Sequence, residues 1–134
     1  MPKVMKKRVS LMLVSFMIFV AAAIAQEVPA GLTNAFKHGS ADELSSFMGS
    51  HVEIIQPDGT KDYDKDGAKQ FMATFFANNK VKGFNINHQG KRDESGFIVG
   101  TLATSEGTYR INCFFKKTDN NFLIHQIRID KTNE

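Results

Sequence analysis

Two stretches near the end of the chain alternate apolar and polar residues in the way that is typical of half-buried β-strands. The first covers residues 109–117 and the second covers residues 121–130. One set of alternating positions is expected to face the core, namely Tyr109, Ile111, Cys113 and Phe115 in the first stretch and Leu123, His125, Ile127 and Ile129 in the second. We predict that the two stretches form an antiparallel pair, around which the rest of the chain is arranged.

The loop between these strands decides their register, because a slip of one residue turns every side chain to the opposite face. A three-residue loop at 118–120, with its last residue in the left-handed conformation, keeps both core sets on one face. This register places Cys113 opposite His125. A two-residue loop would instead pair Ile111 with Arg128, so we predict the longer loop.

The residues before this pair predict two short helices, a β-hairpin, a longer helix and two more strands. The first helix opens at 28–31 and ends at Gly39, and residues 40–43 form a capping box for a second helix that stops at Gly49. Gly100 lies inside a predicted strand and indicates a bulge or a sharp bend. The strands are expected at 51–56 and around 61–63, joined by a tight turn at 57–60, and at 83–90 and 96–104.

The longest predicted helix begins at Asp64 and runs to about Asn78. Its apolar residues recur at intervals of three and four, as expected for a stripe that faces a sheet: Ala68, Phe71, Met72, Phe75 and Phe76. The chain therefore predicts an α+β domain in which two helices, a hairpin and a long helix precede a four-stranded antiparallel meander.

The first 25 residues have the pattern of a cleaved secretory signal peptide. A basic segment at 6–8 precedes a mostly apolar stretch at 11–22 and the small residues Ala23 and Ala25. We expect cleavage after Ala25, a single mature domain at 26–134, and a periplasmic or extracellular location. An uncleaved membrane anchor is the alternative, and Met5 is an alternative start. The mature chain holds one cysteine, which excludes a disulfide within it.

The charge balance argues against a nucleic-acid partner. The whole chain carries a formal net charge of +3, but four of its 17 basic residues and none of its 14 acidic residues lie in residues 1–25. The remainder holds 13 basic groups against 14 acidic ones, a net charge of −1. We therefore expect no basic surface of the kind that binds nucleic acid, and no membrane association once the signal is removed.

The order of elements over 26–130 resembles the nuclear transport factor 2-like superfamily, whose fold is also called cystatin-like. More narrowly, residues 100–109 (GTLATSEGTY) and 122–130 (FLIHQIRID) look like an exported bacterial family catalogued as domain of unknown function 4783. The resemblance implies a cone, in which a strongly bent antiparallel sheet wraps around the long helix and encloses a pocket. The superfamily includes isomerases, cyclases and dehydratases as well as binding and dimerising modules, so the resemblance implies a fold rather than a chemistry.

Four residues are candidates for lining that pocket: His88, Tyr109, Cys113 and His125. A cysteine opposite a histidine can form a thiolate nucleophile, because a protonated imidazole lowers the thiol pKa. A mid-strand cysteine between apolar neighbours more commonly packs in a core. Isomerases of the superfamily pair a tyrosine with acids, and the pattern assigns no acid to the inner face beside Tyr109. We name no catalytic residue, no metal ligand and no cofactor.

Residues 62–67 (DYDKDG) match the first half of a calcium-binding loop. The twelfth position of such a loop needs a bidentate glutamate, and here it is Ala73, within the predicted helix. Acidic residues at a helix start are also favoured by capping and by the helix dipole. We therefore interpret this segment as a helix start.

The opposite face of the final strand pair carries Phe114, Phe122 and Ile124. A face of this kind is too apolar for a free surface and is a candidate interface for a partner or for a second copy of the chain. We favour an exported, non-catalytic module that binds a small apolar ligand or a protein in a mostly apolar pocket. A dimerising structural module and a small enzyme of the isomerase or hydrolase type are the alternatives.

Overall fold

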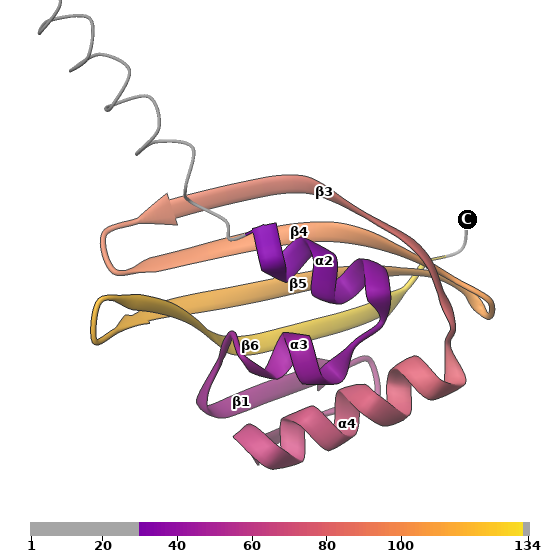
Figure 1. Ribbon diagram of the computed structural model, residues 1–134, viewed down its shortest axis with the longest axis horizontal. Helices are drawn as coiled ribbons and strands as arrows, with labels where there is room; N and C mark the ends of the chain where they lie inside the picture. Colours follow the sequence, from indigo (N-terminus) through magenta and orange to yellow (C-terminus); the bar gives the residue numbers. More distant parts are fainter. Residues whose placement is uncertain (1–29, 133–134) are drawn as a thin grey trace, which may run out of the picture.

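The computed structural model describes residues 30–132, in which three helices lie on one side of a bent six-stranded sheet (Figure 1). The predicted signal peptide at 1–25 lies outside the described residues. No helix within 30–132 is long and apolar enough to cross a membrane. The helices are α2 (Ala30–His38), α3 (Ala41–Ser45) and α4 (Lys65–Asn78). The strands are β1 (Met48–Gln56), β2 (Gly59–Asp64), β3 (Val81–Arg92), β4 (Ser95–Thr104), β5 (Gly107–Thr118) and β6 (Asn121–Lys131).

The sheet is mixed rather than wholly antiparallel. Its strand order is β2-β1-β6-β5-β4-β3. The β1–β2 hairpin and the antiparallel meander from β3 to β6 form as the sequence predicts. β1, however, pairs with β6 in parallel, with Ile54 beside Ile127. The prediction of an antiparallel sheet is wrong at this pair, because pairing between strands far apart in the chain leaves no trace in local alternation.

Aromatic rings join the helices to the sheet. The apolar stripe of α4 is buried as predicted, except that Phe71 is only half-buried. Phe36 of α2 stacks on Phe84 of β3 with ring centroids 4.7 Å apart, and it meets Phe76 of α4 edge-on at 6.4 Å. These contacts bring α2, α4 and β3 into one core.

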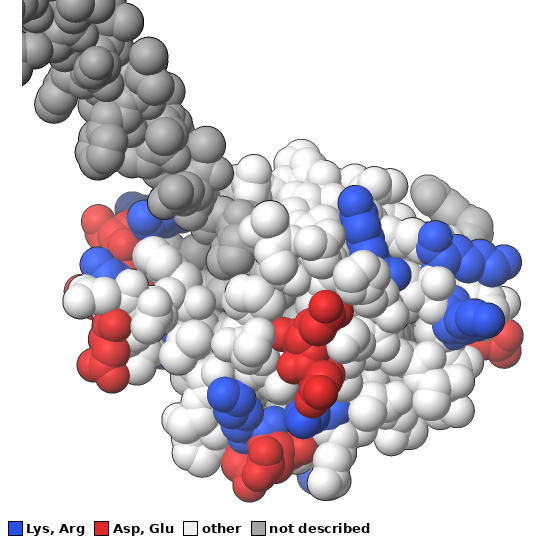
Figure 2. All heavy atoms as spheres, viewed as in Figure 1, with Lys and Arg blue, Asp and Glu red and all other residues white. Residues whose placement is uncertain are grey.

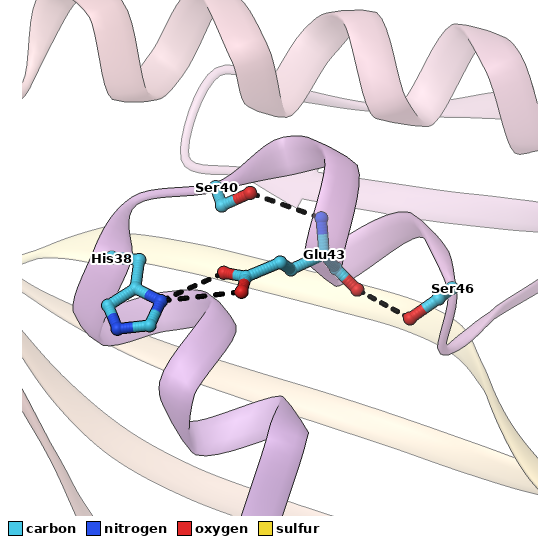
Figure 3. A network of polar contacts seen from close by, with 4 residues as sticks. All are labelled: His38, Ser40, Glu43 and Ser46. Carbon is cyan, nitrogen blue, oxygen red and sulfur yellow. Dashed lines mark hydrogen bonds and ion pairs between the residues drawn. The ribbon is translucent and has the colours of Figure 1, made fainter.

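Two short polar side chains fix the starts of α3 and α4. Ser40 caps α3, and its Oγ accepts a hydrogen bond from the backbone N–H of Glu43 at 3.1 Å (Figure 3). The Glu43 carboxylate lies 3.0 Å from Nδ1 of His38 (Figure 3). Asp64 caps α4 in the same way by accepting from the N–H of Gly67 at 2.7 Å. The acidic segment before α4 thus provides a helix cap, as predicted.

β1 begins earlier than predicted. α3 ends at Ser45, and Gly49, which we expected to stop that helix, lies inside β1. A Cβ at this position would stand 3.4 Å from the carbonyl oxygen of Ile124 in β6. Gly49 therefore lies in a strand beside β6 and does not end a helix.

The turn between β5 and β6 has two residues, not the predicted three. Thr118 pairs directly with Asn121. Between them, Asp119 and Asn120 both have positive φ, at 50° and 68°, as a type I′ turn requires. Asp and Asn tolerate this conformation better than most residues, which explains why the pair can form the tight turn.

A β-bulge in β6 restores the alternation that the short turn would otherwise break. Phe115 pairs with Ile124, whereas Phe114 pairs with Gln126, so His125 is an extra residue without a partner across the ladder. Beyond this bulge, Ile111 pairs with Ile129 and not with Arg128. The predicted register, which placed Cys113 opposite His125, is wrong by two residues, one from the shorter turn and one from the bulge, so Ile127 and Ile129 still face the core as predicted. The core set in β6 is Ile124, Ile127 and Ile129.

Candidate functional site

A cavity of about 380 Å³ lies between α4 and the β1–β2 hairpin. A smaller hollow of about 260 Å³ adjoins it and shares three of its lining residues, Gln56, Tyr63 and Phe71. The cavity combines aromatic rings with uncharged hydrogen-bonding groups. It is lined by Gln56, Tyr63, Gln70, Phe71, Thr74, Phe75, Asn78 and Asn79.

Helical spacing on α4 arranges most of this lining. Gln70, Thr74 and Asn78 stand four residues apart and form an exposed row along the rim. Phe71 and Phe75 form the next row, turned further toward the sheet, and are half-buried and buried respectively. Two adjacent rows of one helix thus supply a polar edge and an aromatic wall.

Strand β2 supplies the opposing ring. Tyr63 lies against Phe71 with ring centroids 5.7 Å apart and an interplanar angle of 45°. Lys61 places its Nζ over the Tyr63 ring, 5.5 Å from the centroid. These contacts hold the tyrosine in place on the hairpin side of the cavity.

Asn79, which follows α4, connects the cavity to Tyr109. Its backbone N–H and its Nδ2 both donate to the carbonyl oxygen of Phe75, each at 2.9 Å. Its Oδ1 accepts a hydrogen bond from the Tyr109 hydroxyl at 2.8 Å. The rings of Phe75 and Tyr109 meet edge-on, with centroids 5.1 Å apart. Tyr109 thus orients a lining residue through its hydroxyl and supports the aromatic wall through its ring.

The site carries no formal charge of its own. None of the eight lining residues is acidic or basic. The carboxylate that an isomerase-type reaction would place beside a tyrosine does not occur in this lining, and the Tyr109 hydroxyl donates to a side-chain amide. On the helix-bearing face of the molecule, basic and acidic side chains are interspersed, and neither sign forms a continuous field (Figure 2). Such a site can hold a neutral ligand by stacking and hydrogen bonding.

The structure does not bring the four predicted pocket residues together. Tyr109 lies beside the cavity, but His88 and His125 are exposed, the latter at the bulge in β6. Cys113 is wholly buried and pairs with Ile127, so the predicted Cys113–His125 pair is wrong. Burial raises the pKa of the Cys113 thiol to about 12, which keeps it protonated near neutral pH. The thiolate hypothesis therefore loses its geometric support.

The predicted outer-face cluster is corrected in the same way. Phe114 is 45% exposed, as expected for an outward residue. Ile124 is fully buried, and Phe122 packs partly against the core, because the shorter turn reverses the facing of this end of β6. The outward partner of Phe114 is instead Phe97, which is 39% exposed, with ring centroids 6.4 Å apart. Phe97 precedes the buried Ile98 in β4, so the alternation of the strand was the signal in the sequence that Phe97 points outward.

Comparison with known families and structures gives a consistent result. A family model described as "Domain of unknown function (DUF4783)" matches residues 30–130. A crystal structure of a DUF4783 family protein from Bacteroides ovatus is 57% identical, with a TM-score of 0.79, covering 81% of this chain and 99% of that one. One from Bacteroides uniformis is 52% identical, with a TM-score of 0.77, covering 81% of this chain and 100% of that one. No curated protein matches this chain.

More distant structures share the fold alone. A domain of unknown function with a cystatin-like fold from Nostoc punctiforme is 10% identical, with a TM-score of 0.61, over 78% of this chain and 72% of that one. A putative dehydratase from the NTF2-like family of Streptomyces avermitilis is 12% identical, with a TM-score of 0.56, over 78% of this chain and 90% of that one.

Proposed function

Since this chain belongs to the bacterial family of the domain of unknown function DUF4783 and has the nuclear transport factor 2-like fold, we propose that it is an exported, non-catalytic binding module. Its ligand is a small, uncharged molecule with an apolar face. The binding site is the cavity between α4 and the β1–β2 hairpin, which we take as the open end of the cone that the family resemblance implies.

The composition of the cavity lining carries this proposal. Three aromatic residues, Tyr63, Phe71 and Phe75, offer apolar surface, and amide and hydroxyl groups surround them without any charged side chain. The volume of about 380 Å³ falls within the range of roughly 300–1,000 Å³ that small-molecule sites occupy. Amides both donate and accept hydrogen bonds, so they suit a neutral ligand better than an ion.

The enzyme and dimer alternatives receive less support. An enzyme of the isomerase type would need an acid near Tyr109, whose hydroxyl donates instead to Asn79. The likeness to a putative dehydratase at 12% identity carries a fold and no activity. A dimerising module would use the outer face of the sheet, where Phe97 and Phe114 provide two exposed rings.

A blocking substitution with a matched control tests the binding site. Thr74 lines the cavity from an exposed position on α4, and Ala73 is exposed on the same helix but does not line it. Native mass spectrometry of protein purified from its source should show a retained small molecule in the wild type and in Ala73→Trp, and none in Thr74→Trp. Absence of any retained molecule from the wild type, or its survival in Thr74→Trp, would contradict the proposal.

Export is tested separately from binding. N-terminal sequencing of the protein from the envelope or the medium should begin at Gln26, because the small residues before it form the expected cleavage site. A sequence that begins at Met1 or Met5 would remove export from the proposal and leave the binding site unaffected.

A further inference from the structure

A second hollow, of about 810 Å³, opens on the outer face of the sheet over β3, β4 and β5. Its lining residues in β4 alternate with residues of the core, so it lies on the side of the sheet that faces away from the helices. It shares no residue with the α4 cavity. Its lining consists of Asn87, His88, Val99, Thr101, Thr108, Arg110, Asn112 and Thr132.

The lining of this hollow holds two basic residues, on the two strands that flank β4, and no acid. Arg110 and His88 are the ionisable residues of the lining. The carboxylate nearest in register to Arg110 is that of Asp130, which pairs with Nε of Arg128 at 2.9 Å. Within residues 30–132 Arg110 itself has no ion-pair partner. An exposed guanidinium in this position is suited to a carboxylate, which it can bind through two parallel hydrogen bonds.

A hydrogen-bond acceptor lies near Arg110 on the same strand. Asn112 lies two residues beyond Arg110 on β5, so both side chains project from the same face of the sheet. Its Oδ1 is buried and receives no hydrogen bond from any residue in 30–132. A buried acceptor of this kind favours a ligand that brings an O–H or N–H group to it.

A β-bulge in β3 directs two consecutive side chains into the same hollow. The register of β3 against β4 shifts between Ile86 and His88, and both Asn87 and His88 line the hollow. In a regular strand, neighbouring residues face opposite sides, so the bulge is what brings both here. Thr101 Oγ1 donates to Oδ1 of Asn87 at 2.7 Å, which turns the Nδ2 donors of Asn87 away from Thr101.

We propose that the outer-face hollow binds a small hydroxy-carboxylic acid. The carboxylate lies against Arg110, with His88 and the Nδ2 group of Asn87 as further donors. Asn112 Oδ1 is buried in the free protein, so the Asn112 side chain must turn toward the hollow before a hydroxyl group of the same ligand can donate to it. This site is independent of the proposed ligand cavity on α4.

Two sugars that differ in one group provide the probes, because glucuronate carries the carboxylate that glucose lacks. Titration of the full mature chain followed by backbone amide NMR should show that glucuronate shifts the signals of Arg110 and Asn112 and that glucose does not. Arg110→Gln should weaken glucuronate binding at least about tenfold. Lys116→Gln is the matched control, because Lys116 is exposed on the same strand and the same face but lies outside the hollow. It should bind as the wild type does.

Asn112→Leu tests the acceptor, and its amide spectrum shows whether the variant folds. Asn112→Leu should weaken glucuronate binding. It should not change the retention of a small molecule in the α4 cavity, which Thr74→Trp is expected to abolish. Equal binding of glucuronate and glucose, or no shifts at millimolar glucuronate, would overturn the proposal. Equal weakening by Lys116→Gln and Arg110→Gln, or inorganic phosphate binding as tightly as glucuronate, would reduce the site to a general electrostatic attraction and overturn it as well.

Discussion

Replacing Gly100 with alanine tests how closely the buried aromatic rings pack against the sheet. A Cβ at this position would stand 2.5 and 2.6 Å from two ring atoms of Phe84 and 2.9 Å from the carbonyl oxygen of Asn85. Carbon atoms in contact normally lie roughly 3.5–4.0 Å apart. The Phe84 ring cannot move back freely, because it is buried and stacks on Phe36 with centroids 4.7 Å apart.

The expected loss of stability follows from two opposing effects. Overpacking a well-filled core destabilises by about 1–3 kcal/mol. Replacing glycine also restricts the unfolded chain, which stabilises by about 0.4–1 kcal/mol. The obstruction includes a backbone atom as well as a ring, so we expect a net loss of about 1–2 kcal/mol for Gly100→Ala. Gly83 of β3 is the matched control, because nothing lies within 4 Å of a Cβ there. Gly83→Ala should gain about 0.4–1 kcal/mol.

Urea unfolding followed by circular dichroism compares the stability of both variants with that of the wild type. The urea concentration at the unfolding midpoint is compared between variants that have the same m-value. Adding Phe84→Leu to Gly100→Ala should recover part of the loss beyond what additivity predicts, because the smaller side chain vacates the space that the new methyl group needs. If Gly100→Ala matches or exceeds the wild type in stability, the aromatic core is looser than the distances imply and the reasoning fails.

Three further predictions concern the core, the thiol and the turn. Phe75→Ala should lower the free energy of unfolding by about 3–5 kcal/mol, measured by urea unfolding, and a loss below about 1 kcal/mol would mean that the ring faces solvent. Cys113 should resist iodoacetamide in the folded protein and react after unfolding. Below pH 9.0 the thiol is protonated in both the folded and the unfolded chain, so its ionisation does not affect stability. Between pH 9.0 and about 12 the unfolded chain loses a proton that the folded chain keeps. The free energy of unfolding of the wild type should therefore fall by up to about 1.4 kcal/mol per pH unit relative to Cys113→Ala. Asn120→Gly should be neutral or mildly stabilising, whereas Asn120→Val should lose about 1–2 kcal/mol in the same unfolding assay, because φ is 68°.

Local signals in the sequence predicted the elements well and their long-range relations less well. The stripe on α4 and the caps at Ser40 and Asp64 depend on neighbours within one or two turns, and the structure contains them. The register of β5 and β6 depends on the two-residue turn at Asp119 and Asn120 and on one inserted residue, His125. Residues 122–124 are consecutively apolar, so the alternation of apolar and polar residues does not decide which of their side chains point to the core. The sequence also offers no signal for the bulge.

The cavity on α4 was not predicted because its residues come from separate elements. Gln56 belongs to a strand, and Gln70, Thr74 and Asn78 belong to a helix that precedes most of the sheet in the sequence. Their spacing of four residues was visible on α4, but it is also the spacing of an ordinary solvated helix face. Only the three-dimensional structure shows that this row borders aromatic rings.

The parallel contact between β1 and β6 has a consequence for how the chain folds. The β1–β2 hairpin joins the rest of the sheet only through β6, and the hydrogen bond from Gln126 to Glu53 links residues 73 apart in the sequence. During synthesis, which proceeds from the N-terminus, the sheet therefore cannot be completed until β6 is available. Closure of so long a loop is entropically unfavourable and slows folding, so the unpaired edge of β1 stays open to other strands during that interval. β6 therefore connects the β1–β2 hairpin to the other strands of the sheet, and this connection can form only after β6 has been synthesised.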